Sequence, residues 1–386
     1  MVHVVSAANH TLNSSHTIRD GETIVSPGGM FQLGFFGLGN PTNRYLGMWF
    51  KNITVRTYIW VANRHAPLTT KSGVLRFTEP VGNLALFNHT NGIVVWSTNS
   101  SRPVRNPYTQ LLNTGNLVVK DAACDYRSDI FLWQSFDYLT DSFLPGMSLG
   151  WDYARRVETY LSSWTSLDDP APGEYSSHLD PTGYPQVLNM RGEVIVKRVG
   201  PWNGARFSGS KGTRNGPTLR MNKNEVKYME ENEDPSVATL IKLLPDGVGQ
   251  RWVWDYRAGS WAIFNLTNEV CDGYNMCGAH ASCDNMNSPA SYCGCLDKFE
   301  PRDPESWERM DWSNGCVRSA SLNCEGVTLL EELFVHNLHG VGYTRIGERV
   351  FILPWDLVDI RAMAQGGQDL YIRLASTALN SKGIKN

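Results

Sequence analysis

Seven of the eight cysteines in this chain fall in one short segment of the sequence. They stand at Cys271, Cys277, Cys283, Cys293, Cys295, Cys316 and Cys324. Zinc sites usually show paired C-x2-C knuckles or two closely spaced histidines, and this segment has neither spacing. A segment this short buries little apolar surface, so the unequal loops between its cysteines favour a module held together by disulfides. Reduced cytosolic thiols are the alternative, and the clustering argues against them. The sequence therefore predicts an oxidised module in an extracytoplasmic protein.

The spacing of the first six of these cysteines resembles that of an EGF-like domain. The resemblance implies the pairing of that family, which here gives Cys271–Cys283, Cys277–Cys293 and Cys295–Cys316. It leaves Cys124 and Cys324 without a family partner. Some EGF-like domains bind calcium through residues just before the first cysteine, but Asn268-Glu269 stands one residue out of register. Because calcium needs six or more oxygens in a fixed geometry, we expect no metal and no cofactor.

Composition excludes several classes of protein. A net charge of −3 and a pI near 6.3 give no basic surface for nucleic acid or an anionic membrane. Thirteen Trp, 35 Gly and 19 Pro with few helical periods indicate an all-β chain rich in turns. No apolar run approaches the roughly 18 residues that span a bilayer, so we expect no membrane span here. Residues 1–8 are expected to be the remnant of a signal peptide. Six sequons are candidate N-glycosylation sites, at Asn9, Asn13, Asn52, Asn88, Asn99 and Asn265.

A threefold repeat organises the N-terminal part of the sequence. Three β-rich segments each contain a tryptophan, and Trp60, Trp96 and Trp133 stand 36 and then 37 residues apart. The string Gly-Asn-Leu precedes an alternating strand at 82–84 and again at 115–117. A few short strands cannot bury their apolar face alone, whereas three units around an axis bury their tryptophans against one another. The repeat therefore predicts a β-prism with these three tryptophans near its axis.

Several strings in this region carry a family resemblance. They are Phe31–Phe36, Tyr45–Phe50, Trp60–Arg64, Trp133–Tyr138 and, further on, Gly200–Gly209. They resemble the ectodomains of plant S-locus glycoproteins and S-domain receptor-like kinases, which begin with a bulb-type lectin domain. The resemblance implies a mainly β chain with tandem bulb-lectin-like β-prism domains, an EGF-like module and a truncated PAN/apple-like tail. The expected divisions are an N-terminal segment 1–16, a bulb-type lectin domain 17–150, an S-locus glycoprotein domain 151–266, an EGF-like module 267–324, a degenerate PAN/apple-like domain 325–376 and a tail 377–386.

The mannose-binding lectins of this fold use a Q-x-D-x-N-x-V-x-Y motif, whose period of two places its side chains on one strand face. In this chain the equivalent positions are degenerate, with Glu79, Asn83 and Phe87 in one repeat and Asn116 and Val118 in another. Loss of the Asp and Tyr removes an acceptor and a hydroxyl from each site. Both asparagines also follow a glycine at the entry to a strand, as turn residues do. We therefore do not expect mannose to bind at these positions.

The resemblance weakens after Cys324 and returns at Leu353–Ile360 and Gly367–Leu374. The family has a PAN/apple domain here, and its internal cysteines are missing from this sequence. Each native disulfide of a small secreted module contributes about 2–5 kcal/mol, so we expect this tail to be poorly stable. We also expect the two lectin-like domains and the EGF-like module to fold independently of it.

The resemblance implies an extracellular ligand-recognition region of an S-domain receptor-like kinase, or its soluble S-locus-glycoprotein-like form. Such proteins serve pollen recognition and cell-surface signalling, and they are secreted or face outward from the plasma membrane. The implied partners are an extracellular protein, peptide or glycan ligand and a related ectodomain in a homo- or heterodimer, with no nucleic acid. The kinase expected in full-length members is absent from this chain, which has no Gly-rich phosphate loop, H-R-D or D-F-G motif, so we expect no enzyme. The alternatives are a mannose-binding lectin and a non-functional truncated gene product.

Overall fold

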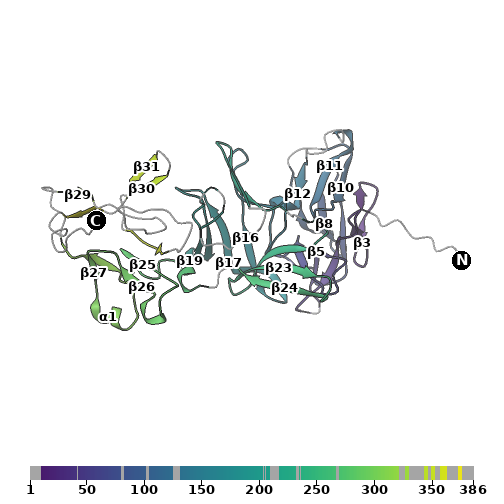
Figure 1. Ribbon diagram of the computed structural model, residues 1–386. Coiled ribbons are helices and arrows are strands. Elements are labelled where there is room, and N and C mark those ends of the chain that lie inside the picture. Colours follow the sequence, from purple (N-terminus) through teal and green to yellow (C-terminus); the bar gives the residue numbers. More distant parts are fainter. Residues whose placement is uncertain are drawn as a thin grey trace. The chain divides into compact units, whose positions relative to one another are not determined.

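The computed structural model of the chain is drawn in Figure 1. It describes residues 10–40, 42–79, 82–100, 104–124, 131–202, 204, 206–208, 217–231, 234, 236–266, 269–320, 327–329, 343–346, 349–352, 357–362 and 373–375. The chain divides into two compact units. Unit 1 comprises Met1–Pro181, Asn189–Val194 and Thr213–Leu266, and unit 2 comprises Thr182–Leu188, Ile195–Gly212 and Thr267–Asn386. The architecture is mainly β, as the sequence predicts, and the described residues include a single short α-helix.

Unit 1 begins with three four-stranded antiparallel sheets of the same design. Each consists of a short strand followed by three strands that are joined in succession, in the orders β3-β4-β5-β6, β2-β7-β8-β9 and β1-β10-β11-β12. The last strand of each sheet carries one of the three repeated tryptophans. The strands are β1 (Thr11–Asn13), β2 (Ile18–Arg19), β3 (Thr23–Val25), β4 (Phe31–Gly37), β5 (Arg44–Phe50), β6 (Tyr58–Val61), β7 (Gly73–Phe77), β8 (Leu84–Asn88), β9 (Val94–Ser97), β10 (Pro107–Leu111), β11 (Leu117–Asp121) and β12 (Trp133–Gln134).

The three tryptophans form a nearly equilateral triangle at the centre of these sheets. The ring centroids are 5.8 Å apart for Trp60 and Trp96, 5.6 Å for Trp96 and Trp133, and 6.1 Å for Trp60 and Trp133. Every pair meets edge to face, with interplanar angles of 66° to 78°, which is a favoured geometry for aromatic rings. The indole Nε1 of Trp60 also donates to the carbonyl of Tyr138 at 2.9 Å. The prediction of a β-prism with these residues near its axis is confirmed.

A second set of β-strands follows in unit 1. Strand β16 pairs with β17, and two further sheets have the orders β15-β14-β21-β20 and β13-β22-β23-β24. Residues 181–185 join β17 to β18. These strands are β13 (Ser142–Phe143), β14 (Ser148–Asp152), β15 (Val157–Thr159), β16 (Leu161–Ser166), β17 (Asp169–Asp180), β20 (Thr218–Met221), β21 (Glu225–Met229), β22 (Thr239–Leu243), β23 (Gly249–Asp255) and β24 (Ser260–Asn265). Strand β18 (Gln186–Arg191) is divided between the two units, and β19 (Val194–Val199) belongs to unit 2 except for its first residue.

Arg64 connects the β-prism to the β16–β17 pair. Its buried guanidinium donates to the carbonyls of Pro170 at 2.9 Å, Ser162 at 3.1 Å and Ser163 at 2.5 Å. Burial lowers the pKa of this arginine, although the nearby carboxyl of Asp141 acts in the opposite direction. A planar guanidinium with five donors suits such a set of carbonyls better than an ammonium group does. The arginine of the Trp60–Arg64 string therefore has a structural role.

An ion cluster on sheet β15-β14-β21-β20 gives a pH-dependent prediction. Lys227 Nζ lies 2.9 Å from a carboxylate oxygen of Glu225 and 3.3 Å from one of Asp152. The hydrogen bond from Lys227 lowers the pKa of Glu225 below its ordinary 4.5. A lowered native pKa stabilises the fold above the unfolded pKa, and this contribution is lost as the pH falls through the native pKa.

Lys227→Met should therefore reduce the free energy of unfolding at pH 7, and the reduction should shrink towards zero at about pH 3. Urea unfolding of both proteins at the two pH values measures this difference. A difference that stays equal at pH 7 and pH 3 would contradict the role of the ion pair.

Unit 2 contains the cysteine-rich module. Three disulfides join Cys271–Cys283, Cys277–Cys293 and Cys295–Cys316, with Cα atoms 5.6, 5.4 and 5.8 Å apart, and these are the pairs that the resemblance implies. The elements are β25 (Ala281–Cys283), β26 (Cys293–Cys295), β27 (Phe299–Pro301), α1 (Pro304–Glu308), β28 (Cys316–Arg318), β29 (Val327–Leu329), β30 (Tyr343–Ile346), β31 (Arg349–Ile352), β32 (Ile360–Arg361) and β33 (Arg373–Ala375). The Cys124 side chain and Cys324 lie outside the described part of the chain.

We expected the cysteine-rich module to fold independently of the tail, but residues 357–362 of the tail pack into the module. Strand β32 pairs in parallel with β25, and Leu357 and Ile360 are buried in the same apolar cluster as the disulfide cysteines. The carbonyl of Leu357 also accepts a hydrogen bond from the His280 backbone at 2.6 Å. The independence expected from the sequence is therefore wrong for this segment. A small module has too little apolar surface of its own, and the segment completes its core.

Candidate recognition surface

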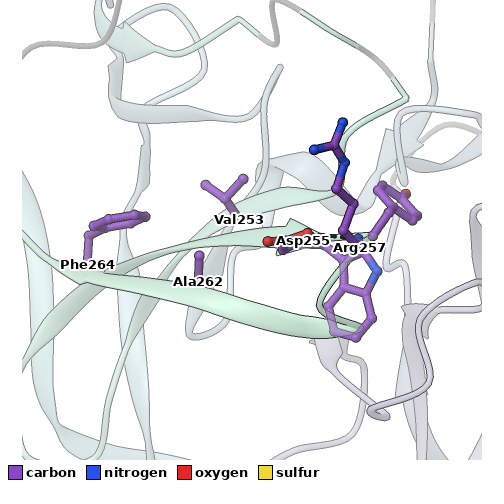
Figure 2. A pocket seen from close by; sticks show the side chains of 7 residues that line it. Val253, Asp255, Arg257, Ala262 and Phe264 are labelled. Atoms are coloured by element: carbon purple, nitrogen blue, oxygen red, sulfur yellow. Dashed lines mark hydrogen bonds between the residues drawn. The ribbon is translucent and has the colours of Figure 1, made fainter.

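The β23–β24 hairpin presents an open, mainly apolar cavity at the surface of unit 1 (Figure 2). Its turn contains Ala258-Gly259, and Gly259 has φ +63°, a conformation that glycine adopts without strain. A carboxylate oxygen of Asp255 accepts from the backbone amides of Arg257 at 2.8 Å and Ala258 at 3.1 Å. These bonds hold the turn and place the two charged side chains beside the cavity.

The cavity is shallow and has a volume of about 450 Å³. It is lined by Val253, Trp254, Asp255, Tyr256, Arg257, Ala262 and Phe264. Figure 2 shows Phe264 at one end, Asp255 and Arg257 towards the other, and Val253 and Ala262 between them. Phe264 is 58% exposed and Tyr256 is 54% exposed, which is unusual for large aromatic side chains on two adjacent strands and their turn.

The hairpin is firmly attached to the rest of unit 1. The Tyr256 hydroxyl donates to the carbonyl of Ser236 at 3.0 Å, and Trp261 Nε1 donates to the Thr57 hydroxyl at 3.0 Å. The Trp261 ring also packs against Phe50 of the β-prism and against buried Trp254, with centroids 5.7 and 5.3 Å away. The exposed aromatic side chains therefore stand on a preorganised support, which lowers the entropic cost of binding.

A half-buried charge pair includes Arg251 of the same strand, β23. One nitrogen of Arg251 lies 2.7 and 2.8 Å from the two carboxylate oxygens of Glu230, and Tyr228 donates to the same carboxylate at 2.5 Å. Burial raises the pKa of Tyr228, and the Glu230 charge raises it further, so its hydroxyl stays a donor. Arg251 and Glu230 neutralise each other, which leaves Asp255 and Arg257 as the charged groups that line the cavity.

The degenerate sugar-motif positions lie elsewhere in unit 1. Glu79 is exposed, and Phe87 lies under the guanidinium of Arg76, 4.1 Å from ring centroid to Cζ. Asn83 and Asn116 each stand just before a strand, and their side-chain oxygens accept from the Ser100 amide and the Ser135 hydroxyl, respectively. Asn116 is buried. Val118 is also buried, so neither residue offers a surface for a sugar ring.

The residues just before the first disulfide cysteine are engaged in protein contacts. Glu269 accepts from Asn285 Nδ2 at 2.7 Å, and Asp272 accepts from the Glu269 backbone at 3.0 Å. The other Asp272 oxygen pairs with Arg361 at 3.0 Å. Asn268 lies outside the described residues. The carboxylate oxygens of Glu269 and Asp272 are therefore engaged in hydrogen bonds and an ion pair within the protein. Calcium requires six or more oxygen ligands, and these contacts compete with that coordination.

A hydrogen-bonded trio joins β15 to β17, and sequence spacing did not reveal it. The imidazole of His178 lies 2.8 Å from Glu158 Oε1 through Nδ1 and 2.9 Å from Ser176 Oγ through Nε2. This order resembles a serine hydrolase relay, but Tyr160 stacks on the imidazole with centroids 4.5 Å apart. Nucleophilic catalysis also needs donors for an oxyanion beside a substrate cavity, and the cavity of Figure 2 has other lining residues. We interpret the trio as polar pairing between strands.

The predicted glycosylation positions differ in their accessibility. Asn13, Asn52, Asn99 and Asn265 are exposed. Asn88 is half-buried, and its side-chain oxygen accepts from the Ser72 hydroxyl at 2.8 Å. Asn9 lies outside the described residues.

The aromatic residues of the cavity were missed as site residues at the level of sequence. A usable signal was present, because alternation in β23 and β24 sends Trp252, Trp254 and Trp261 to one face and leaves Val253 and Phe264 on the other. An exposed apolar residue on the second face of a hairpin whose first face is already packed indicates a contact surface.

The chain combines a β-prism, a second set of β-sheets and a module held by three disulfides. Residues 57–165 match the D-mannose binding lectin family, and residues 197–303 match the S-locus glycoprotein domain. The chain is 38% identical over 408 residues to the S-locus-specific glycoprotein S6 of Brassica oleracea. The aligned region covers 95% of this chain and 92% of that protein. The chain belongs to the family of S-locus glycoproteins and S-domain receptor kinases.

The receptor kinases of this family are longer than the chain. This chain is 36% identical over 415 residues to the receptor-like serine/threonine-protein kinase SD1-8 of Arabidopsis thaliana. The aligned region covers 98% of this chain and 48% of that protein. The chain thus spans about half the length of the receptor kinases that it matches. A monocot mannose-binding lectin from Gastrodia elata is 20% identical with a TM-score of 0.25, over 33% of this chain and 94% of that one. Among the residues that the structure describes, no helix has the length and apolar character needed to cross a membrane.

Proposed function

We propose that this chain is an extracellular recognition region of the S-domain type, in a receptor or in a soluble S-locus glycoprotein, without catalytic activity of its own. The proposed ligand is an extracellular protein or peptide that places an apolar side chain in the β23–β24 cavity. The observation that carries this proposal is the pair of exposed aromatic residues, Tyr256 and Phe264, on a rigid hairpin. The close similarity to S-locus glycoproteins supports the extracellular role.

The chemistry of the cavity favours a peptide over mannose. Sugar sites present several hydrogen-bonding side chains towards one ring, whereas this cavity has Val253, Ala262 and Phe264 along most of its length. The Asp255 and Arg257 side chains offer one acceptor and one donor group at a single end (Figure 2). That arrangement suits an apolar anchor flanked by a charged residue, as in protein interfaces with central hot spots.

Phe264→Ser should weaken binding of the folded chain to its peptide ligands by tenfold or more, because truncating an aromatic hot spot costs about 2 kcal/mol or more. Peptides that bind the secreted, 386-residue chain are first selected from a displayed library, and their affinity for both proteins is then measured. Ile93→Ser is a matched control, because Ile93 is equally exposed but lies next to strand β9.

A glycan array on the same protein tests the alternative function, which is the binding of mannose. Equal affinity of the selected peptides for wild type and Phe264→Ser would overturn the assignment of the cavity. If the protein bound mannosylated glycans and no peptide could be selected, the chain would instead be a mannose-binding lectin.

A further inference from the structure

Strand β24 has an outer edge whose free backbone groups can be located from the hydrogen bonds around it. It is the last strand of the sheet β13-β22-β23-β24, and in the described part of the chain it pairs with β23 alone. In an antiparallel pair, residues that direct both N–H and C=O to the partner strand alternate with residues that direct both away from it. An edge strand therefore presents the N–H and C=O of every second residue to the outside.

Two hydrogen bonds fix the phase of this alternation. The amide of Leu266, which follows β24, donates to the carbonyl of Gly249 at 2.8 Å. The amide of Trp254 donates to the carbonyl of Ala238 at 2.9 Å, so Trp254 is bonded towards β22 and not towards β24. By alternation from Leu266, Phe264 is also bonded to β23. The residues of β24 that direct N–H and C=O outward are therefore Trp261, Ile263 and Asn265.

The cavity of Figure 2 is lined by residues of this same edge strand. Ala262 and Phe264 belong to the lining, and the Phe264 side chain is 58% exposed. In a strand added to the edge, the position opposite Phe264 is a non-hydrogen-bonded one, where the two Cα atoms lie about 4.5 Å apart and the side chains pack closely. A side chain at that position would lie against the Phe264 ring on the cavity face.

We propose that the peptide ligand binds as an additional antiparallel strand on the outer edge of β24, an inference that rests on the proposed function. Its backbone pairs with the outward N–H and C=O of Ile263 and Asn265, and every second side chain enters the cavity beside Phe264. In this mode of recognition, backbone pairing at a free edge supplies affinity, and a pocket for alternate side chains supplies specificity.

The surroundings of β24 favour a peptide over a second copy of this chain. At one end of the strand, Trp261 packs on Phe50 of the β-prism and donates to the Thr57 hydroxyl, so a folded partner would have to fit beside the prism. An extended peptide needs only the spacing between neighbouring strands, about 4.8 Å. The other end of the strand is open, and Ile263 there is 48% exposed.

The test uses peptides selected against the secreted 386-residue chain, in two series. One series replaces each side chain by alanine, and the other N-methylates each backbone amide. In an antiparallel added strand, the residues that bond to Ile263 and Asn265 direct their side chains away from the cavity. N-methylation should therefore weaken binding by about tenfold or more at every second residue, because a hydrogen bond is lost and a methyl group meets the edge. Alanine should weaken binding at the residues between them.

The two series separate this inference from the proposed function. Peptides that depend on Phe264 but show no alternation on N-methylation would overturn the added strand and leave the proposed function standing. Sensitivity to N-methylation and to alanine at the same residues would contradict the antiparallel pairing. If no selected peptide depended on Phe264, the proposed function would fail, and the added strand with it.

Ile263→Pro tests the same edge from the side of the protein. Proline has no N–H, and an edge strand accepts it where the N–H is directed outward, so the bonds between β23 and β24 are kept. Peptide affinity should fall by about tenfold or more, whereas Ile263→Ala, which keeps the amide, should change it much less. Equal affinities of the two variants would overturn the proposal. A dimer of the free chain that Ile263→Pro dissociates in sedimentation would also overturn it, because the edge would then belong to a second copy.

Discussion

Asp359→Asn is expected to lower the free energy of unfolding of unit 2 by about 3–5 kcal/mol, because it leaves a buried guanidinium without its counter-charge. Arg198 is 1% exposed, and its side chain pairs with the Asp359 carboxylate. The same guanidinium donates to the carbonyl of Asp359 at 2.8 Å and to that of Gly200 at 3.1 Å. Asp359 also accepts from the Asn275 backbone at 3.1 Å, so one carboxylate connects three segments of unit 2.

Urea unfolding of the disulfide-intact chain, followed by hydrogen exchange in the cysteine-rich module, measures this effect. Glu174→Gln is the matched control, because Glu174 and Arg191 form an ion pair that is largely exposed to solvent. An exposed pair of this kind contributes about 0–1 kcal/mol, so the control should change little. An Asp359→Asn protein with wild-type stability and exchange would show that residues 357–362 are not part of the module's core.

Trp60→Ala is expected to cost about 3–5 kcal/mol, which is the usual range for truncating a large buried aromatic residue. Trp60 loses two edge-to-face contacts, and its buried indole no longer donates to the carbonyl of Tyr138. That carbonyl is left without this donor, which adds to the cost of the cavity. Trp96 is only partly buried, so Trp96→Ala should cost less than Trp60→Ala.

Denaturant unfolding of the two alanine variants and of Trp60→Phe tests this order. The phenylalanine variant keeps an aromatic ring in the triangle and loses only the indole hydrogen bond and part of the volume, so it should fall between wild type and Trp60→Ala. A larger loss for Trp96→Ala than for Trp60→Ala would contradict the packing seen around the prism axis.

The local patterns of this sequence determined a large part of the fold. The period of 36 to 37 residues between tryptophans places each one on the last strand of its sheet, because each repeat is a unit of similar length with the same order of strands. The turn at Ala258-Gly259 was also readable, since glycine is needed where φ is positive. Both inferences rest on residues close together in the sequence, where chain geometry alone restricts the structure.

The tertiary structure decided which distant residues meet. No spacing connects Arg198 to Asp359, which are 161 positions apart, or Arg64 to the carbonyls of β16 and β17. The same holds for the surface of the β23–β24 hairpin. Alternation sorts its side chains into two faces, but only the packing of Trp261 on Phe50 and Thr57 shows which face is covered. Exposure is a property of the whole fold, and it leaves Tyr256 and Phe264 free to bind while the tryptophans beside them are buried or half-buried.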